Sequence, residues 1–523
     1  SNSKNPIQSN SFVSDMRVYS AYYSLDLSFG KYATVSATGR VDKSTALPQS
    51  HNSYFYPSLS AASVISDYTN LPEFISYLKV RASYAAVRGD ATSATIGAAP
   101  FNSISAFGSG SAGTSIFDYP LGYGNNYESP YGGPNYSLIA VYSTSKPYNN
   151  QTAAYYTSNI YDPNIKPFNR VNYEGGFDIR FMNNRLGLSA TAFEYIDGPQ
   201  ILRNPISSAT GYDYFYINGL KTKKTGYELS LTGTPYRSRN ISWNILVNWS
   251  TYQDKYLELP PGQDVFNEFF HKGDRVDKLY TSAFVKTSDG KIINDDAGKP
   301  LSNPVAQFLG NENANFAWSV YNKVSWKSLT LGFQFDGSVG GVTTDYMHNK
   351  TMRGGRNIET VQGALGAARK DDNDHAGDNN SPDPFPGSYV GEGVVVSNGV
   401  PINYDNSGNI INYKDLTFSP NTQVTHVQDY VSKYYNISEA NLMSKTFAKL
   451  REVSLGYDFP AKWLAKSFIN KVTISVVARN LIYFYKDKRF KDVDLDQYNY
   501  ATDGTGLQSP TTRRLGFNLN VVF

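Results

Sequence analysis

The sequence has no cysteine among its 523 residues. This absence excludes disulfide bridges, thiol nucleophiles and zinc sites built on cysteine. Charge is also scarce: Asp, Glu, Lys and Arg make up 18% of the residues, against about 25% in a typical globular chain. The formal net charge of +3 is too small to indicate a nucleic acid or an anionic surface as partner. We therefore expect no thiol chemistry and no nucleic-acid partner.

Enzyme motifs are missing as well. The five histidines are scattered, without the HExxH or HxH spacing of a metal site. The sequence contains no GxSxG, no Walker loop and no GxGxxG followed by a helical pattern. It therefore predicts neither an enzyme nor a bound cofactor.

Long apolar runs are absent too. No segment approaches the ~18 consecutive apolar residues of a transmembrane helix. The opening residues, SNSKNPIQSN, lack the basic and apolar regions of a signal peptide. We therefore expect an exported protein to have lost its N-terminal part, and this chain to be a fragment or a mature remainder.

Aromatic residues and glycine, by contrast, are abundant. There are 42 Tyr, 29 Phe and 42 Gly, and aromatic residues make up 15% of the chain. The mean hydropathy is nevertheless only −0.43. This combination favours a β-barrel with a lipid-facing apolar belt and a polar interior.

Apolar and polar residues alternate over the last residues of the chain. The apolar set is Leu515, Phe517, Leu519, Val521 and Phe523. A period of two predicts a strand with one apolar and one polar face. Roughly fourteen segments show this pattern. The length of each is close to the ~9–11 residues that a tilted strand needs to cross a bilayer. They include residues 21–42, 77–87, 171–181, 225–233, 243–250, 316–326, 329–337, 448–460 and 471–484.

A soluble β-sandwich or propeller would alternate in the same way. Charged residues stand in the middle of the polar face, including Glu174, Asp178, Arg180 and Glu228, where a packed core would not tolerate them. If that face meets bulk solvent, the apolar face is a core, and the residues alone leave this open. Connection lengths favour the barrel: short turns such as MNNR alternate with long links at 88–168, 255–278 and 341–444. We predict a transmembrane antiparallel β-barrel over residues 1–523, with the long links extracellular.

Several ordered segments resemble the SusC/RagA family of TonB-linked outer-membrane proteins of Bacteroidetes. They are FAKLREVSLGYDFP (447–460), VTISVVARNL (472–481), KDVDLD (491–496) and the terminal SPTTRRLGFNLNVVF. Upstream segments at 31–45, 54–67, 78–90, 162–195, 279–301 and 308–341 agree in order and spacing. The resemblance implies an all-β fold: the C-terminal part of a 22-stranded TonB-dependent transporter barrel, with the plug absent from this chain.

The resemblance also implies a function. We expect TonB-dependent import of oligosaccharides or oligopeptides through the bacterial outer membrane, together with a SusD/RagB-like surface lipoprotein. TonB would act through the absent N-terminal part, and outer-membrane lipid would surround the strands. Peptide and glycan remain equally open as substrate. Two alternatives stay open: a SusC-like barrel serving as a structural subunit of a larger outer-membrane complex, and a passive pore.

Four parts of the sequence are candidate functional sites. Oxygen ligands in KDDNDHAGDNN, namely Asp371, Asp372, Asp374 and Asp378, could hold Ca²⁺, although a solvated loop is the favoured interpretation of this segment and of 491–496. Tyr123, Tyr127, Tyr131 and Tyr136 could stack on a sugar or bond a peptide backbone, or simply pack neighbouring loops. The same two readings apply to 391–413, which in the family lies where the lipoprotein docks. The terminal strand with its aromatic end, Phe523, resembles the membrane-assembly signal of outer-membrane barrels.

Overall fold

The computed structural model describes residues 17–45, 47–89, 142–143, 147–149, 151–152, 155–156, 159–376, 385–465, 467–489, 495 and 512–523. The chain divides into two compact units. Unit 1 comprises Ser1–Leu231 and Tyr252–Val276, and unit 2 comprises Thr232–Thr251 and Asp277–Phe523.

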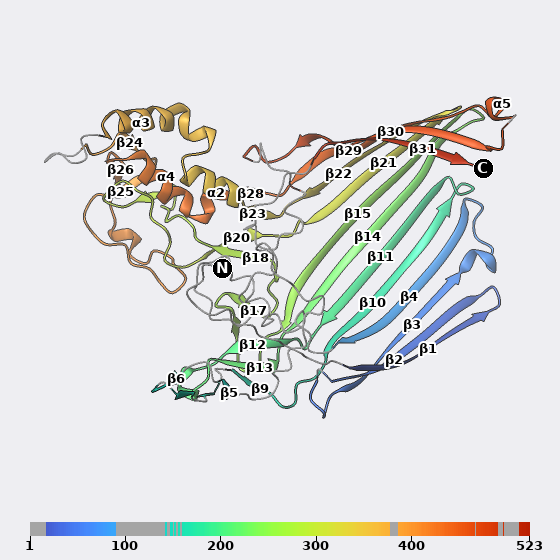
Figure 1. Ribbon diagram of the computed structural model, residues 1–523, viewed down its shortest axis with the longest axis horizontal. Helices are drawn as coiled ribbons and strands as arrows, with labels where there is room; N and C mark the ends of the chain where they lie inside the picture. The colour runs from blue at the N-terminus through green and yellow to red at the C-terminus, as the bar shows by residue number, and fades with distance from the viewer. Residues whose placement is uncertain are drawn as a thin grey trace. The chain divides into compact units, whose positions relative to one another are not determined.

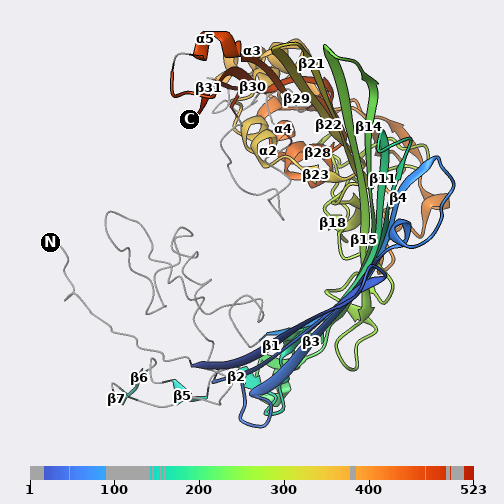
Figure 2. The same cartoon turned by 90° about the vertical axis from the view of Figure 1, so that its right-hand side faces the viewer.

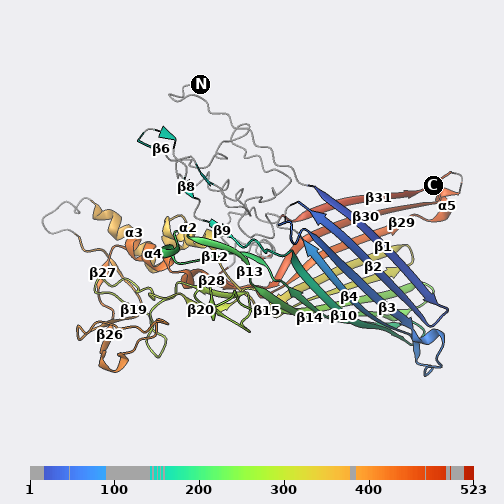
Figure 3. The same ribbon diagram turned by 90° about the horizontal axis from the view of Figure 1, so that it is seen from below.

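Thirteen long strands form the main sheet, and their order in the sheet is their order in the chain. Unit 1 holds β1 (Val18–Phe29), β2 (Ala33–Ser44), β3 (Ser53–Val64), β4 (Ile75–Gly89), β10 (Phe168–Phe181) and β11 (Leu186–Asp197). Unit 2 holds β21 (Phe316–Trp326), β22 (Leu329–Val339), β29 (Phe447–Asp458), β30 (Lys471–Tyr485) and β31 (Arg514–Val522). β14 (Lys221–Arg237) and β15 (Ile241–Glu258) have residues in both units. Figure 3 shows β1 to β4 and β10 side by side.

The alternating segments of the sequence coincide with these strands. The thirteen long strands are close to the approximate count of fourteen alternating segments. Within each unit, neighbouring long strands pair antiparallel, as β1 does with β2 and β22 with β29. A meander of this kind places successive connections at opposite ends of the strands.

Connection lengths alternate sharply. The hairpins β1–β2, β10–β11 and β21–β22 turn within residues 30–32, 182–185 and 327–328. The MNNR turn predicted from the sequence is real: Met182, Asn183 and Asn184 all have positive φ, between 53° and 64°, and asparagine tolerates this conformation best among residues with a side chain. The connections β4–β10, β15–β21 and β22–β29 are far longer, over residues 90–167, 259–315 and 340–446.

The two faces of the sheet differ in character, and the apolar face is exposed. In unit 2, Leu331, Leu455, Val476 and Phe517 are successive cross-strand partners. Their exposed fractions are 39%, 51%, 56% and 64%. Unit 1 has the same arrangement, with Leu25, Leu59 and Tyr173 about half exposed. The apolar face is therefore not the core of a soluble sheet, which removes the alternative that the sequence left open.

The long connections contain short strands and small cores of their own. In unit 1 these strands are β5 (Tyr142–Ser143), β6 (Pro147–Tyr148), β7 (Gln151–Thr152), β8 (Tyr155–Tyr156), β9 (Asn159–Tyr161), β12 (Ile201–Pro205), β13 (Tyr214–Asn218), β16 (Val265–Phe266) and β17 (Phe270–His271). In unit 2 they are β18 (Lys278–Thr281), β19 (Ile293–Asn294), β20 (Gln307–Asn311), β23 (Val342–Thr344), β24 (Tyr389–Val390), β25 (Val394–Val396), β26 (Phe418–Pro420), β27 (Val424–Thr425) and β28 (Leu442–Ser444). The 3-10 turns are η1 (Ile65–Asp67), η3 (Ser208–Thr210), η4 (Ile358–Val361), η6 (Tyr413–Asp415) and η7 (Ser438–Asn441).

Three helices of unit 2 pack together within the β22–β29 connection. They are α2 (Tyr346–Arg353), α3 (Gly363–Asp374) and α4 (Val427–Asn436). Met352, Ala368, Val427 and Val431 form their common core. In Figure 1 these helices lie beyond one end of β21, β22 and β29, and α5 (Ala461–Leu464) lies at the other end. We call α2, α3, α4 and the residues packed on them, 342–444, the helical lobe.

No helix in the part of the chain that the structure covers is long and apolar enough to cross a membrane.

Candidate functional site

The polar face of the unit 1 sheet is built from cross-strand rows. One row runs Asp26, Ser36, Ser60, Ser83 and Glu174 over five strands. The next row runs Ser28, Thr34, Ala62, Arg81, Gly176 and Thr191. Because side chains alternate between faces, all of these point to the side opposite the apolar belt. The sequence therefore places hydroxyls and charges together on one wall.

Small side chains leave this wall hollow between β2 and β11. A pocket of about 230 Å³ is lined by Thr34, Ser36, Ser60, Ala61, Ala62, Lys79, Arg81, Ala82, Ser83, Glu174, Gly175 and Thr191. Its titratable groups are Lys79, Arg81 and Glu174. We call it the wall pocket.

Arg81 is held rigidly at the edge of the wall pocket. Its two terminal nitrogens donate to Asp178 Oδ2 at 2.6 Å and to Thr191 Oγ1 at 2.6 Å. Gly176 makes room for the guanidinium, since a Cβ there would lie 3.1 Å from Arg81 Cζ and 2.6 Å from the Ala190 carbonyl oxygen. A glycine is therefore required beneath this ion pair.

Unit 2 carries a comparable charged wall. Arg451 is the extra residue of a bulge in β29 and donates to Asp336 Oδ2 from Nε at 2.8 Å and from a terminal nitrogen at 2.6 Å. Arg479 donates to Glu452 at 2.6 Å. Lys449 is only 1% exposed, and its Nζ lies 5.0 Å from the centre of the Tyr483 ring, a cation–π arrangement. The charged side chains named here on the unit 2 wall each have a partner, either an opposite charge or an aromatic ring.

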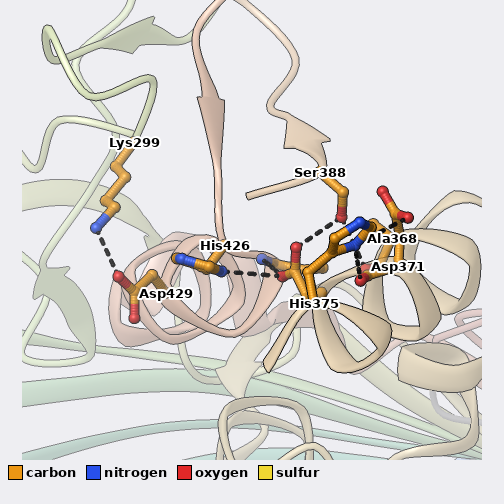
Figure 4. A network of polar contacts seen from close by, with 9 residues as sticks. Lys299, Ala368, Asp371, His375, Ser388, His426 and Asp429 are labelled. Atoms are coloured by element: carbon orange, nitrogen blue, oxygen red, sulfur yellow. Dashed lines mark hydrogen bonds and ion pairs between the residues drawn. The ribbon is translucent and has the colours of Figure 1, made fainter. Parts of the chain in front are cut away.

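Three of the four predicted calcium ligands, Asp371, Asp372 and Asp374, lie at the end of α3, and each has its own partner. Asp372 accepts hydrogen bonds from Val427 N–H at 2.6 Å and Ser388 Oγ at 2.7 Å. His426 Nδ1 lies 3.7 Å from the same carboxylate. Asp372 therefore fastens α3 to the start of α4. Figure 4 shows Ser388 and His426 in this network.

The neighbouring carboxylates turn to other partners. Asp371 lies 3.6 Å from His375 Nδ1, and Asp374 pairs with Lys370 one helical turn earlier. Asp378 lies outside the described residues. Among the residues that the structure describes, no group of three or more His, Asp or Glu could hold a metal ion, so the Ca²⁺ site stays a prediction that depends on Asp378.

Some of the other candidate residues predicted from the sequence lie within the described residues, and others lie outside them. Tyr123, Tyr127, Tyr131 and Tyr136 lie outside the described residues, so their role stays a prediction. Of segment 491–496 the structure describes Leu495, which is 1% exposed and packs against Met443, Phe447 and Tyr483.

The terminal strand has the two faces that the sequence predicts. Leu515, Phe517 and Leu519 are 81%, 64% and 57% exposed. Val521, on the same face, pairs with Val472. Phe523, the last residue, stacks on Phe468 with ring centres 5.5 Å apart. Figure 2 shows this C-terminal end near α5. Its role in membrane assembly stays a prediction.

Segment 391–413 ends in a compact turn. Asp405 accepts hydrogen bonds from the backbone N–H groups of Ser407 and Asn409, each at 2.8 Å, and from the Asn409 side chain at 2.9 Å. The Asn409 side chain and these N–H groups lower the pKa of Asp405 below its ordinary value. Gly408 has φ +81° and completes the turn. The turn borders a polar pocket of about 300 Å³ that also contains Lys286, Gln307 and Tyr413.

Sequence reasoning found the polar face but missed the wall pocket and the burial of Lys449. The pocket depends on β4 pairing with β10, which lie 78 residues apart (89 to 168, counting the residues between). Its one sequence signal is three serines at inward positions of three successive strands, Ser36, Ser60 and Ser83.

Comparison with known proteins finds solved structures with a similar fold. No family model matches the chain. TonB-dependent receptor P3 from Formosa agariphila is 19% identical over 340 residues, which are 59% of this chain and 29% of that protein. A solved structure of the RagAB peptide transporter covers 97% of this chain at 14% identity with a TM-score of 0.61. The RagAB peptide importer in its closed-closed state covers 96% at 13% identity with a TM-score of 0.58.

These similarities extend over only part of each relative. The chain spans 29% of the curated relative and 47% of the solved RagAB chains that it matches. Over that part it has the strand architecture of the SusC/RagA-like TonB-dependent transporter barrel. The fold predicted from the sequence is thereby confirmed, and the similarities agree with the resemblance to TonB-linked outer-membrane proteins.

Proposed function

We propose that this chain, with the fold of SusC/RagA-like TonB-dependent transporters, supplies the barrel wall of an outer-membrane importer of oligopeptides or oligosaccharides. One observation carries the proposal: the sheet exposes its apolar face and lines its opposite face with hydroxyls and ion pairs, such as Arg81 with Asp178. Such a wall separates lipid from a wetted lumen. The similar solved structures are those of a peptide transporter and a peptide importer, which supports this proposal.

The wall has no group arranged for covalent chemistry in the described residues. Its charged side chains are instead largely paired across strands, as Arg479 is with Glu452. Paired charges keep the lumen polar without holding a passing solute tightly. We therefore assign these residues to binding and passage, with energy delivered through TonB.

We further propose that a SusD/RagB-like lipoprotein docks on the long connections, which would face outside the cell. The helical lobe (342–444) and the neighbouring turns at 285–301 form two small cores, one around Met352 and Val431 and one around Val285 and Ile293. A connection with its own cores can present a fixed surface to a partner, since its backbone is already ordered.

Uptake by intact cells tests the proposal. A strain that carries the full-length protein should take up a fluorescent oligopeptide or oligosaccharide, and deleting the gene or TonB should abolish uptake. Import regardless of TonB, together with flux of the same solute through liposomes, would identify a passive pore. Purification should yield one SusD-like lipoprotein; recovery only within a large complex, with no uptake, would identify a structural subunit.

A further inference from the structure

The wall pocket contains two opposite charges that make no ion pair. Lys79 and Glu174 both line it, and neither forms a salt bridge with any residue that the structure describes. Asp178 is the cross-strand partner of Lys79, but its carboxylate binds Arg81 at 2.6 Å. Of the three charged side chains that line the pocket, Arg81 is therefore paired with Asp178, whereas Lys79 and Glu174 make no ion pair within the described residues.

The surroundings of Glu174 hold its carboxylate in place without neutralising it. Glu174 Oε1 accepts hydrogen bonds from Asn172 Nδ2 at 2.8 Å and from the Tyr195 hydroxyl at 3.0 Å. Both donors are neutral, so they orient the carboxylate without pairing it with a cation. Ser60 and Ser83, which lie in the row that ends at Glu174, add hydroxyls to the same surface.

The separation of the two charges sets the length of a ligand that satisfies both. Glu174 is the cross-strand partner of Ser83, which lies four residues along β4 from Lys79. Four residues of strand extend over roughly 14 Å. An extended peptide advances about 3.3–3.6 Å per residue, so a tetrapeptide matches this span.

We propose that the wall pocket binds a short oligopeptide with free ends, its ammonium at Glu174 and its carboxylate at Lys79. This inference rests on the proposed import function and selects peptide over glycan as the substrate class. A neutral oligosaccharide would bond the serines but would leave both charges uncompensated. A peptide zwitterion compensates both, and each charge-assisted hydrogen bond is stronger than a neutral one.

Binding to the purified full-length transporter in detergent tests the assignment. The probes are tetra-alanine with free ends, the same peptide N-acetylated, the same peptide C-amidated, and maltotetraose, each titrated by calorimetry. Lys79→Gln should weaken binding of the free peptide about tenfold and leave the C-amidated peptide unchanged. Glu174→Gln should weaken the free peptide to a similar degree and leave the N-acetylated peptide unchanged.

Lys43→Gln is the matched control, because it removes a lysine from β2, two strands away from β4, at an exposed position on the opposite face. It should bind all four probes as the parent protein does. Equal effects of Lys79→Gln on free and amidated peptides, or tighter binding of maltotetraose than of tetra-alanine, would overturn the inference. So would unchanged binding with a lowered melting temperature, which would mean that Lys79 pairs with another part of the protein.

Uptake separates this inference from the import function. Binding with the expected dependence on the peptide ends, but without TonB-dependent uptake, would refute import and leave the pocket assignment standing. TonB-dependent uptake that ignores the ends of the peptide would refute the pocket and leave import standing.

Discussion

A lysine placed at Val476 should destabilise the protein far more than a lysine one residue away. Val476 lies on the apolar face of β30, 56% exposed, between its partners Leu455 and Phe517. It is five residues from Lys471, the first residue of the strand, or roughly 17 Å along it. With a strand tilt of about 40° this corresponds to about 13 Å of depth, the middle of an apolar band about 25 Å tall. There a lysine costs about 2–4 kcal/mol.

Ser475 is the matched position, since it faces the polar wall and pairs with Asn518. Ser475→Lys should cost less than about 1 kcal/mol, as most surface substitutions do. Both costs follow from urea unfolding of the full-length protein refolded into phosphatidylcholine vesicles. Equal destabilisation by the two lysines would show that lipid does not cover the apolar face, and the reasoning would fail.

The remaining predictions concern the long connections. Asp372→Ala removes the acceptor of Val427 N–H and Ser388 Oγ. It should lower the local stability of α4 by about 1–2 kcal/mol, measured by amide exchange, whereas Asp374→Ala, which breaks one surface pair, should change it by less than about 0.5 kcal/mol. Because the folded pKa of Asp405 is lowered, its hydrogen bonds stabilise the turn above the unfolded pKa of about 3.9, and that stabilisation is lost as the pH falls through the folded pKa. At neutral pH the Ser407 and Asn409 amides should therefore exchange more slowly than in Asp405→Asn, and this difference should disappear below about pH 4; a difference that persists at lower pH would contradict the assignment.

The strands could be read from the sequence because period two is a local property. β21 begins at Phe316 and ends at Trp326, as the alternation predicts. The two asparagines at 183 and 184 indicate the turn at 182–185, because asparagine tolerates positive φ. Local pattern does not say which face is covered. That distinction needed the exposure of residues such as Leu455 and Phe517 in the folded chain.

The site was less accessible to sequence reasoning because it depends on register between distant strands. Glu174 and Arg180 were assigned to a polar face, but the proximity of Glu174 to Ser83 follows from pairing of β10 with β4. The carboxylates of 370–380 suggested a metal by composition alone. The fold instead uses Asp372 as an acceptor between two helices, a role that a list of oxygen ligands does not reveal.

The central claim is that lipid contacts alternate residues of each long strand. The chain has no cysteine of its own, so single cysteines from Leu515 to Val522 can carry a spin label at one chosen site at a time. In vesicles, labels at Leu515, Phe517 and Leu519 should be accessible to oxygen dissolved in lipid, and labels at Asn518 and Asn520 to a water-soluble nickel chelate. Uniform accessibility along β31, or the opposite alternation, would contradict the account.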